Sequence, residues 1–114
     1  MTIRRGEIWW AQLDPIRGSE QAGTRPVLVF QNDEVSKFTT TILAIPLTTN
    51  LRRTTLPSCV SIPQGAAGLT STSVALCHQL RALDQNRLAE RIGVVTDQTM
   101  SAIEVRVLYT LGIV

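Results

Sequence analysis

Apolar residues occur along the chain in short segments, and each segment ends at polar residues, glycine or proline. Segments of this length that are rich in β-branched and aromatic side chains are typical of β-strands. The pattern predicts strands over residues 7–13, 25–31, 40–47, 59–62, 73–77 and 92–95, with a further short apolar segment over 79–83. The continuous apolar run 25–31 predicts a central strand buried on both faces, with Pro26 tolerated at its start because proline lacks a ladder donor.

Helical signals are few. Asn32 predicts a capped helical turn over 33–36, and Asp84 caps a turn through residues 86–88. Thr96-Asp97-Gln98 begins the one long helix, which Gly112 ends. Its apolar positions fall on one stripe, formed by Met100, Ile103, Val107, Leu108 and Leu111.

Many short strands followed by one terminal helix indicate a small antiparallel β-barrel or twisted sheet capped by that helix. The fold class is therefore β-rich (α+β). With 114 residues and no repeat or linker, the chain predicts a single domain over residues 1–114.

The composition narrows the functional classes. The net charge is only +2, but ten of the eleven basic residues are arginine, whose planar fork grips phosphate oxygens in pairs. A bias toward arginine in a GC-rich genome explains the same composition equally well.

No apolar stretch is long enough to span a membrane and no signal peptide is evident, so we expect a cytoplasmic protein. Cys59 and Cys77 lack metal-ligand spacing, which predicts buried, reduced cysteines and no metal or cofactor.

Three polar clusters interrupt the strands. Arg25 lies directly before the most apolar strand, where Pro26 fixes its backbone in an extended conformation. An arginine held in this way suits a phosphate, but pairing with Glu7, Asp14 or Glu20 is an equally good explanation.

The second cluster follows the strand 40–47 and contains Thr48, Arg52 and Arg53. A threonine at a strand end can bond a phosphate, although a backbone bond is commoner, and the two arginines form either a solvated loop or a phosphate contact. The third cluster contains His78, the only histidine. It is more often structural than catalytic, yet it titrates near neutral pH.

Together these clusters offer cations, hydroxyls and one titratable group, without metal ligands or a nucleophile paired with a base. This inventory fits cleavage of RNA, because RNA supplies its own nucleophile, the 2′-hydroxyl. The protein then has to orient the chain, move a proton and stabilise charge on the phosphorane. DNA lacks the 2′-hydroxyl and would not react.

The segments RRGEIWWAQLDPIRGSEQAGTRPVLVFQND, AIPLTTN and CHQLRALDQNRLAERIGVV, in this order, resemble the MazF/PemK/Kid toxins of type II toxin–antitoxin modules. The resemblance covers nearly the whole chain. It implies an SH3-like barrel of the MazF/CcdB type with a C-terminal helix. It also implies a homodimeric, metal-independent endoribonuclease that cuts single-stranded mRNA, leaves a 2′,3′-cyclic phosphate and is neutralised by a MazE-like antitoxin. The toxin–antitoxin complex would bind its operator DNA through the antitoxin.

The resemblance also assigns residues. Arg25 is similar to the principal catalytic arginine, Thr48 to its partner on the phosphate, and Glu20 to an acidic residue implicated in activity. His78 stands where many relatives carry an acid, and Leu76 replaces the arginine that pairs with this acid in the Kid branch. Whether His78 transfers protons is therefore left open. RNA contacts are expected from Arg17, Gln21, Thr49, Arg52, Arg53, Gln79 and Arg81.

One alternative comes from a different functional class. CcdB-like toxins share the barrel but inhibit DNA gyrase and cut nothing, so the fold alone does not separate the two. The motif positions of Arg25 and Thr48 favour the nuclease.

Overall fold

The structure is a computed structural model that describes residues 2–13 and 23–113. Its seven strands are β1 (Glu7–Gln12), β2 (Thr24–Val29), β3 (Thr41–Thr48), β4 (Cys59–Ile62), β5 (Ser73–Leu76), β6 (Arg81–Asp84) and β7 (Leu88–Val94). Two α-helices, α1 (Asp33–Ser36) and α2 (Asp97–Thr110), accompany them. Four short 3-10 helices complete the described elements: η1 (Leu51–Thr55), η2 (Ala66–Gly68), η3 (Cys77–Gln79) and η4 (Gln85–Arg87).

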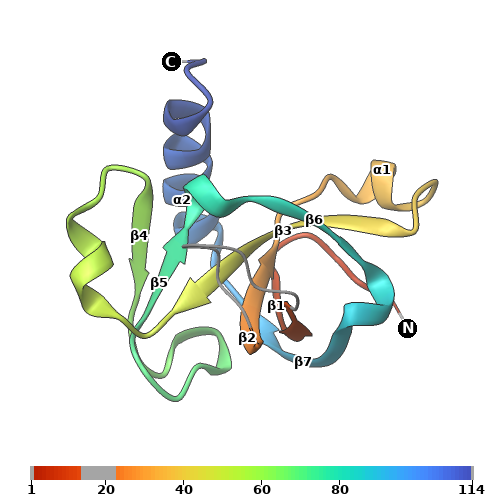
Figure 1. Cartoon of the computed structure of the whole chain (residues 1–114), viewed down its shortest axis with the longest axis horizontal. Coiled ribbons are helices and arrows are strands. Elements are labelled where there is room, and N and C mark those ends of the chain that lie inside the picture. Colours follow the sequence, from red (N-terminus) through yellow and green to blue (C-terminus); the bar gives the residue numbers. More distant parts are fainter. Residues whose placement is uncertain (1, 14–22, 114) are drawn as a thin grey trace.

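The strands form one antiparallel sheet in the order β4-β5-β3-β2-β1-β7, with β6 beside β3. Strand β3 organises this sheet because it pairs with β2 on one side and with both β6 and β5 on the other. The first part of β3, from Thr41 to Ala44, pairs with β6, and its end, Leu47 and Thr48, pairs with β5. In Figure 1 the sheet curls around the interior enclosed by β1, β2, β3, β6 and β7, while β4 and β5 extend away from it toward α2.

Two hydrophobic cores lie on opposite faces of the central strands. The paired residues Ile8, Leu28 and Ile45 face a core that is completed by α2. The neighbouring residues on the same strands, such as Trp9 and Val27, face the interior of the curled sheet. Because side chains alternate across a strand, a strand buried on both faces must be apolar throughout. The prediction that the apolar run after Arg25 is buried on both faces is confirmed.

Helix α2 begins as the sequence predicts, with the Thr96 hydroxyl accepting a hydrogen bond from the Thr99 amide. It packs against β4 and η3 through its buried residues Met100, Ile103 and Val107. The predicted apolar stripe is wrong beyond this point, since Leu108 and Leu111 are exposed. The last turns of the helix extend past the sheet, as the upper part of α2 in Figure 1 shows, so no strand covers them.

The remaining differences from the sequence prediction are local. The last strand is longer than predicted and includes residues 88–91, because two irregularities in its pairing with β1 interrupt the simple alternation of burial. The predicted polar loop after Thr48 contains η1. The strand predicted to reach Cys77 ends at Leu76, and Cys77 begins η3. Both predicted caps, Asn32 and Asp84, are confirmed.

Both cysteines are buried and neither forms a disulfide bond, as predicted. Burial raises the pKa of the Cys77 thiol from its ordinary value of 9.0 to about 12, so this thiol stays protonated at neutral pH. Among the residues that the structure describes, no helix is long and apolar enough to cross a membrane.

Candidate functional site

Arg25 is the second residue of β2 and lies on the exposed end of this strand, opposite Ala11 of β1. The pairing of β2 with β3 reaches as far as Val27, which lies opposite Pro46. Beyond this pair, Arg25 lies two residues nearer the start of β2 and Thr48 lies two residues nearer the end of β3, where Thr48 pairs with β5. The two residues that the sequence singles out therefore come from the adjoining ends of neighbouring strands.

Thr48 is buried at the end of β3, where it pairs with Val74 of β5. Its hydroxyl oxygen accepts a hydrogen bond of 3.1 Å from the backbone amide of Asn50. This is the kind of local backbone bond that the sequence alternative anticipated. A hydroxyl that accepts in this way still has its own proton to donate. The turn therefore fixes the position of the hydroxyl without using its donor.

A hollow of about 280 Å³ lies at these strand ends. Its polar lining comes from three segments that are far apart in the sequence: Thr24 and Arg25, then Thr49, and then Thr70, Ser71 and Ser73. Its apolar lining is formed by Trp10, Pro26, Leu69 and Ile92. A small cavity with an apolar wall and a few converging polar groups is the usual form of a ligand site.

One wall of the hollow is held by close backbone packing between η2 and β7. A Cβ atom on Gly93 would collide with the carbonyl of Ala67, and one on Gly68 would collide with the carbonyl of Ile92. Ala67 itself adopts a left-handed φ of 53°. Only glycine permits this approach, and it places the residues that follow Gly68 at the rim of the hollow.

His78, Gln79 and Arg81 line a different hollow, at η3 and the start of β6. His78 is exposed, and its Nδ1 lies 2.7 Å from the hydroxyl oxygen of Ser58. Of the sequence candidates, the structure therefore brings Arg25 and Thr49 together in one hollow, with Thr48 buried directly before Thr49, and it groups His78 with Gln79 and Arg81 elsewhere.

The other candidates are placed as follows. Arg52 is exposed in η1, and Arg53 lies in the same short helix. Arg17, Glu20 and Gln21 lie outside the described residues, as does Asp14. The carboxylate of Glu7, a further sequence candidate for neutralising Arg25, pairs with Arg91 at 3.0 Å.

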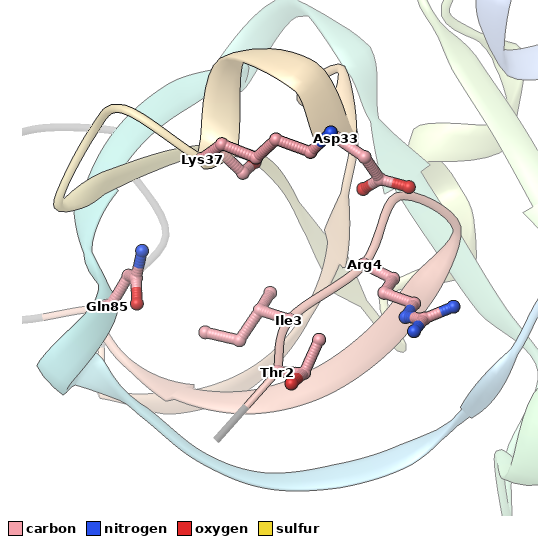
Figure 2. A pocket seen from close by; sticks show the side chains of 7 residues that line it. Thr2, Ile3, Arg4, Asp33, Lys37 and Gln85 are labelled. Atoms are coloured by element: carbon pink, nitrogen blue, oxygen red, sulfur yellow. The ribbon is translucent and has the colours of Figure 1, made fainter.

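A larger hollow of about 430 Å³ lies between the N-terminal segment, α1 and η4. Figure 2 shows Asp33 of α1 and Lys37, the residue after this helix, above Thr2, Ile3 and Arg4, with Gln85 at the side. None of the sequence candidates lines it. Over residues 2–13 and 23–113 there is also no cluster of three or more His, Cys, Asp or Glu side chains that could hold a metal ion.

Comparison with known proteins shows the family of this chain. A family model described as the PemK-like, MazF-like toxin of type II toxin–antitoxin systems matches residues 4–111. The chain belongs to this family. The endoribonuclease MazF of Staphylococcus saprophyticus subsp. saprophyticus is 35% identical over 111 residues, which cover 97% of this chain and 92% of the relative.

Solved structures of related toxins have the same fold. MazF from Deinococcus radiodurans superposes with a TM-score of 0.84 and 26% identity, and the alignment covers 98% of both chains. A mycobacterial endoribonuclease, determined in complex with its cognate antitoxin, gives a TM-score of 0.81 and 26% identity over 99% of this chain and 98% of that one. The predicted family and its barrel-type fold are confirmed, and the CcdB-like alternative is not supported.

Several residues of the hollow escaped the sequence analysis, namely Trp10, Ile92 and the segment from Leu69 to Ser73. One signal for Trp10 was available. Consecutive residues of a strand face opposite sides, so one of the adjacent tryptophans Trp9 and Trp10 had to face away from the barrel interior.

Proposed function

We propose that this toxin is a metal-independent endoribonuclease that cleaves single-stranded mRNA at the hollow beside Arg25. The observation that supports the proposal is the hollow at the start of β2 and the end of β3, which Arg25 and Thr49 both line. The endoribonuclease activity named for the 35% identical relative supports it.

The proposed reaction needs no nucleophile from the protein. The 2′-oxygen of RNA attacks the adjacent phosphorus and loses its proton, the bond from phosphorus to the 5′-oxygen breaks, and the 5′-oxygen gains a proton. The products are a 2′,3′-cyclic phosphate and a free 5′-hydroxyl. Arg25 donates two hydrogen bonds to the phosphorane oxygens, and Thr48 donates a third through the proton that its Asn50 bond leaves available.

The proposed partners follow from the exposed surfaces. Val105, Tyr109 and Ile113 of the C-terminal region are more than half exposed, together with Leu111. A second copy of the chain that covered these residues would give a homodimer. A MazE-like antitoxin would cover the Arg25 hollow and so block RNA, and this antitoxin would carry the complex to operator DNA. The site of action would be the cytoplasm, where mRNA is translated.

Incubation with a long single-stranded RNA in EDTA tests the proposal. We expect defined fragments that end in a cyclic phosphate, and no cleavage of the same sequence made as DNA, which lacks the 2′-hydroxyl. Sequencing of the fragment ends would give the cleavage motif. Intact RNA at enzyme concentrations that exceed the substrate would contradict the proposal.

The separation of His78 from Arg25 leads to a further expectation. If His78 serves mainly to bond Ser58, His78→Gln should leave the dependence of the single-turnover cleavage rate on pH unchanged. A catalytic imidazole would instead give a rate step near pH ~6.5 that disappears in the variant. Superimposable profiles assign His78 a structural role, whereas loss of the step would assign it proton transfer.

A further inference from the structure

The two adjacent tryptophans of β1 have different environments. Trp9 is buried in the interior of the curled sheet, and its indole N–H donates a 3.1 Å hydrogen bond to Glu7. Trp10 is 39% exposed and lines the hollow that contains Arg25. The packing of the core therefore accounts for Trp9, but it does not account for a second large aromatic side chain at the surface.

The surroundings of Trp10 are suited to a flat, partly apolar ligand. Its partner across the strand pair is Pro26, the residue that follows Arg25, and both side chains line the hollow. Leu69 and Ile92 supply the remaining apolar wall, and hydroxyl-bearing residues stand at the rim. A phosphate beside Arg25 thus has an aromatic surface one strand away.

We propose that Trp10 is the stacking platform for one unstacked RNA base next to the cleaved phosphodiester. This inference rests on the proposed function and extends it to the base that the site holds. Single-stranded RNA is generally bound with its bases splayed onto aromatic side chains. A cavity of about 280 Å³ lies near the lower limit for small-ligand sites, which matches one base better than a paired element.

The role of this platform in the reaction would be to fix the sugar. A base held on Trp10 while its phosphate lies on Arg25 restricts the torsions between them. This restriction favours the arrangement in which the 2′-oxygen lies in line with the breaking bond. The platform would favour an unpaired base. It would distinguish only weakly between the four bases, since every base has a π face.

The test uses an oligonucleotide that spans a mapped cleavage site and carries a 2′-deoxy nucleotide at the cut, so that it binds without reacting. Abasic residues replace the bases one at a time, up to three positions on either side, and fluorescence anisotropy gives each affinity. For the wild type we expect one abasic position beside the cut to weaken binding by about 5- to 150-fold. Trp10→Ala should weaken binding of the intact oligonucleotide by a similar factor. This variant should then bind the intact oligonucleotide and the one with the abasic position beside the cut with affinities that agree to within about twofold.

Two further variants make the result decisive. Trp10→Leu retains apolar volume against Pro26 but has no π face. It should show the RNA-binding defect expected of Trp10→Ala, and it provides the test if the alanine variant folds poorly. Phe38→Ala removes an aromatic side chain that is 87% exposed and does not line this hollow, and it should match the wild type. Binding should also quench tryptophan fluorescence in the wild type but not in Trp10→Leu, which retains Trp9.

The outcomes are distinguishable. If the abasic penalty persists in Trp10→Leu, or if this variant binds the intact oligonucleotide as the wild type does, the stacking role is wrong while the nuclease assignment stands. If the wild type neither binds nor cuts RNA, the proposed function fails, and the stacking role fails with it.

Discussion

Arg25→Ala should lower the single-turnover rate of RNA cleavage by about 100-fold or more while the protein stays folded. The side chain is exposed at the end of β2, so its removal leaves the core unchanged. The loss arises because the guanidinium would no longer stabilise the charge that develops on the phosphorane. Arg25→Lys should recover little of the rate, since an ammonium group cannot bond two phosphate oxygens in the same plane.

Arg4→Ala is the matched control for this experiment. Arg4 is also an exposed arginine, but it lines the hollow beside α1 and not the one that contains Arg25. The control removes the same charge from the protein and should cleave at close to the wild-type rate. Near-normal cleavage by folded Arg25→Ala, or an equal loss in both variants, would show that Arg25 has no specific role.

Gly93→Ala should destabilise the protein by about 1–3 kcal/mol and impair cleavage, although Gly93 does not line the hollow. The added methyl group would meet the backbone carbonyl of Ala67, which a side-chain rotation cannot relieve. Either β7 or η2 must move, and a shift of η2 displaces Leu69 and Ser71 at the rim of the hollow. Thermal unfolding and the cleavage rate measure the two effects.

Gly65→Ala separates this steric effect from ordinary backbone strain. Gly65 precedes the same short helix and has a φ of 87°, but a Cβ atom there meets no atom within 4 Å. The substitution should cost about 1–2 kcal/mol through strain alone and leave cleavage nearly intact. If Gly93→Ala has the melting temperature and the cleavage rate of the wild type, the close packing of η2 on β7 does not support the site.

The sequence predicts the parts of this molecule that depend on local patterns. The apolar run after Arg25 indicates a doubly buried strand because alternation across a strand requires it, and Asn32 and Asp84 indicate their caps because these interactions span two residues. The shared role of Arg25 and Thr48 was predicted only through the family resemblance, since residues 23 positions apart on different strands have no local signature of a common site.

The errors involve long-range packing. The apolar stripe of α2 is regular through Leu111, yet burial ends with Val107, because the length of the facing sheet decides where the stripe is covered. The rim of the hollow near Leu69 depends on the contact between Ala67 and Gly93, which no nearby residue predicts.

The pairing of β1 with β7 joins segments that are synthesised far apart in time. Residues 7–12 pair with residues 88–94, and Ile92 of β7 forms part of the wall beside Arg25. A nascent chain that ends after β2 contains Arg25 but lacks this wall until β7 has also been synthesised. Such non-local pairings form late, because they require closure of a long loop. The hollow beside Arg25 is therefore completed only after β7 has been synthesised and has paired with β1.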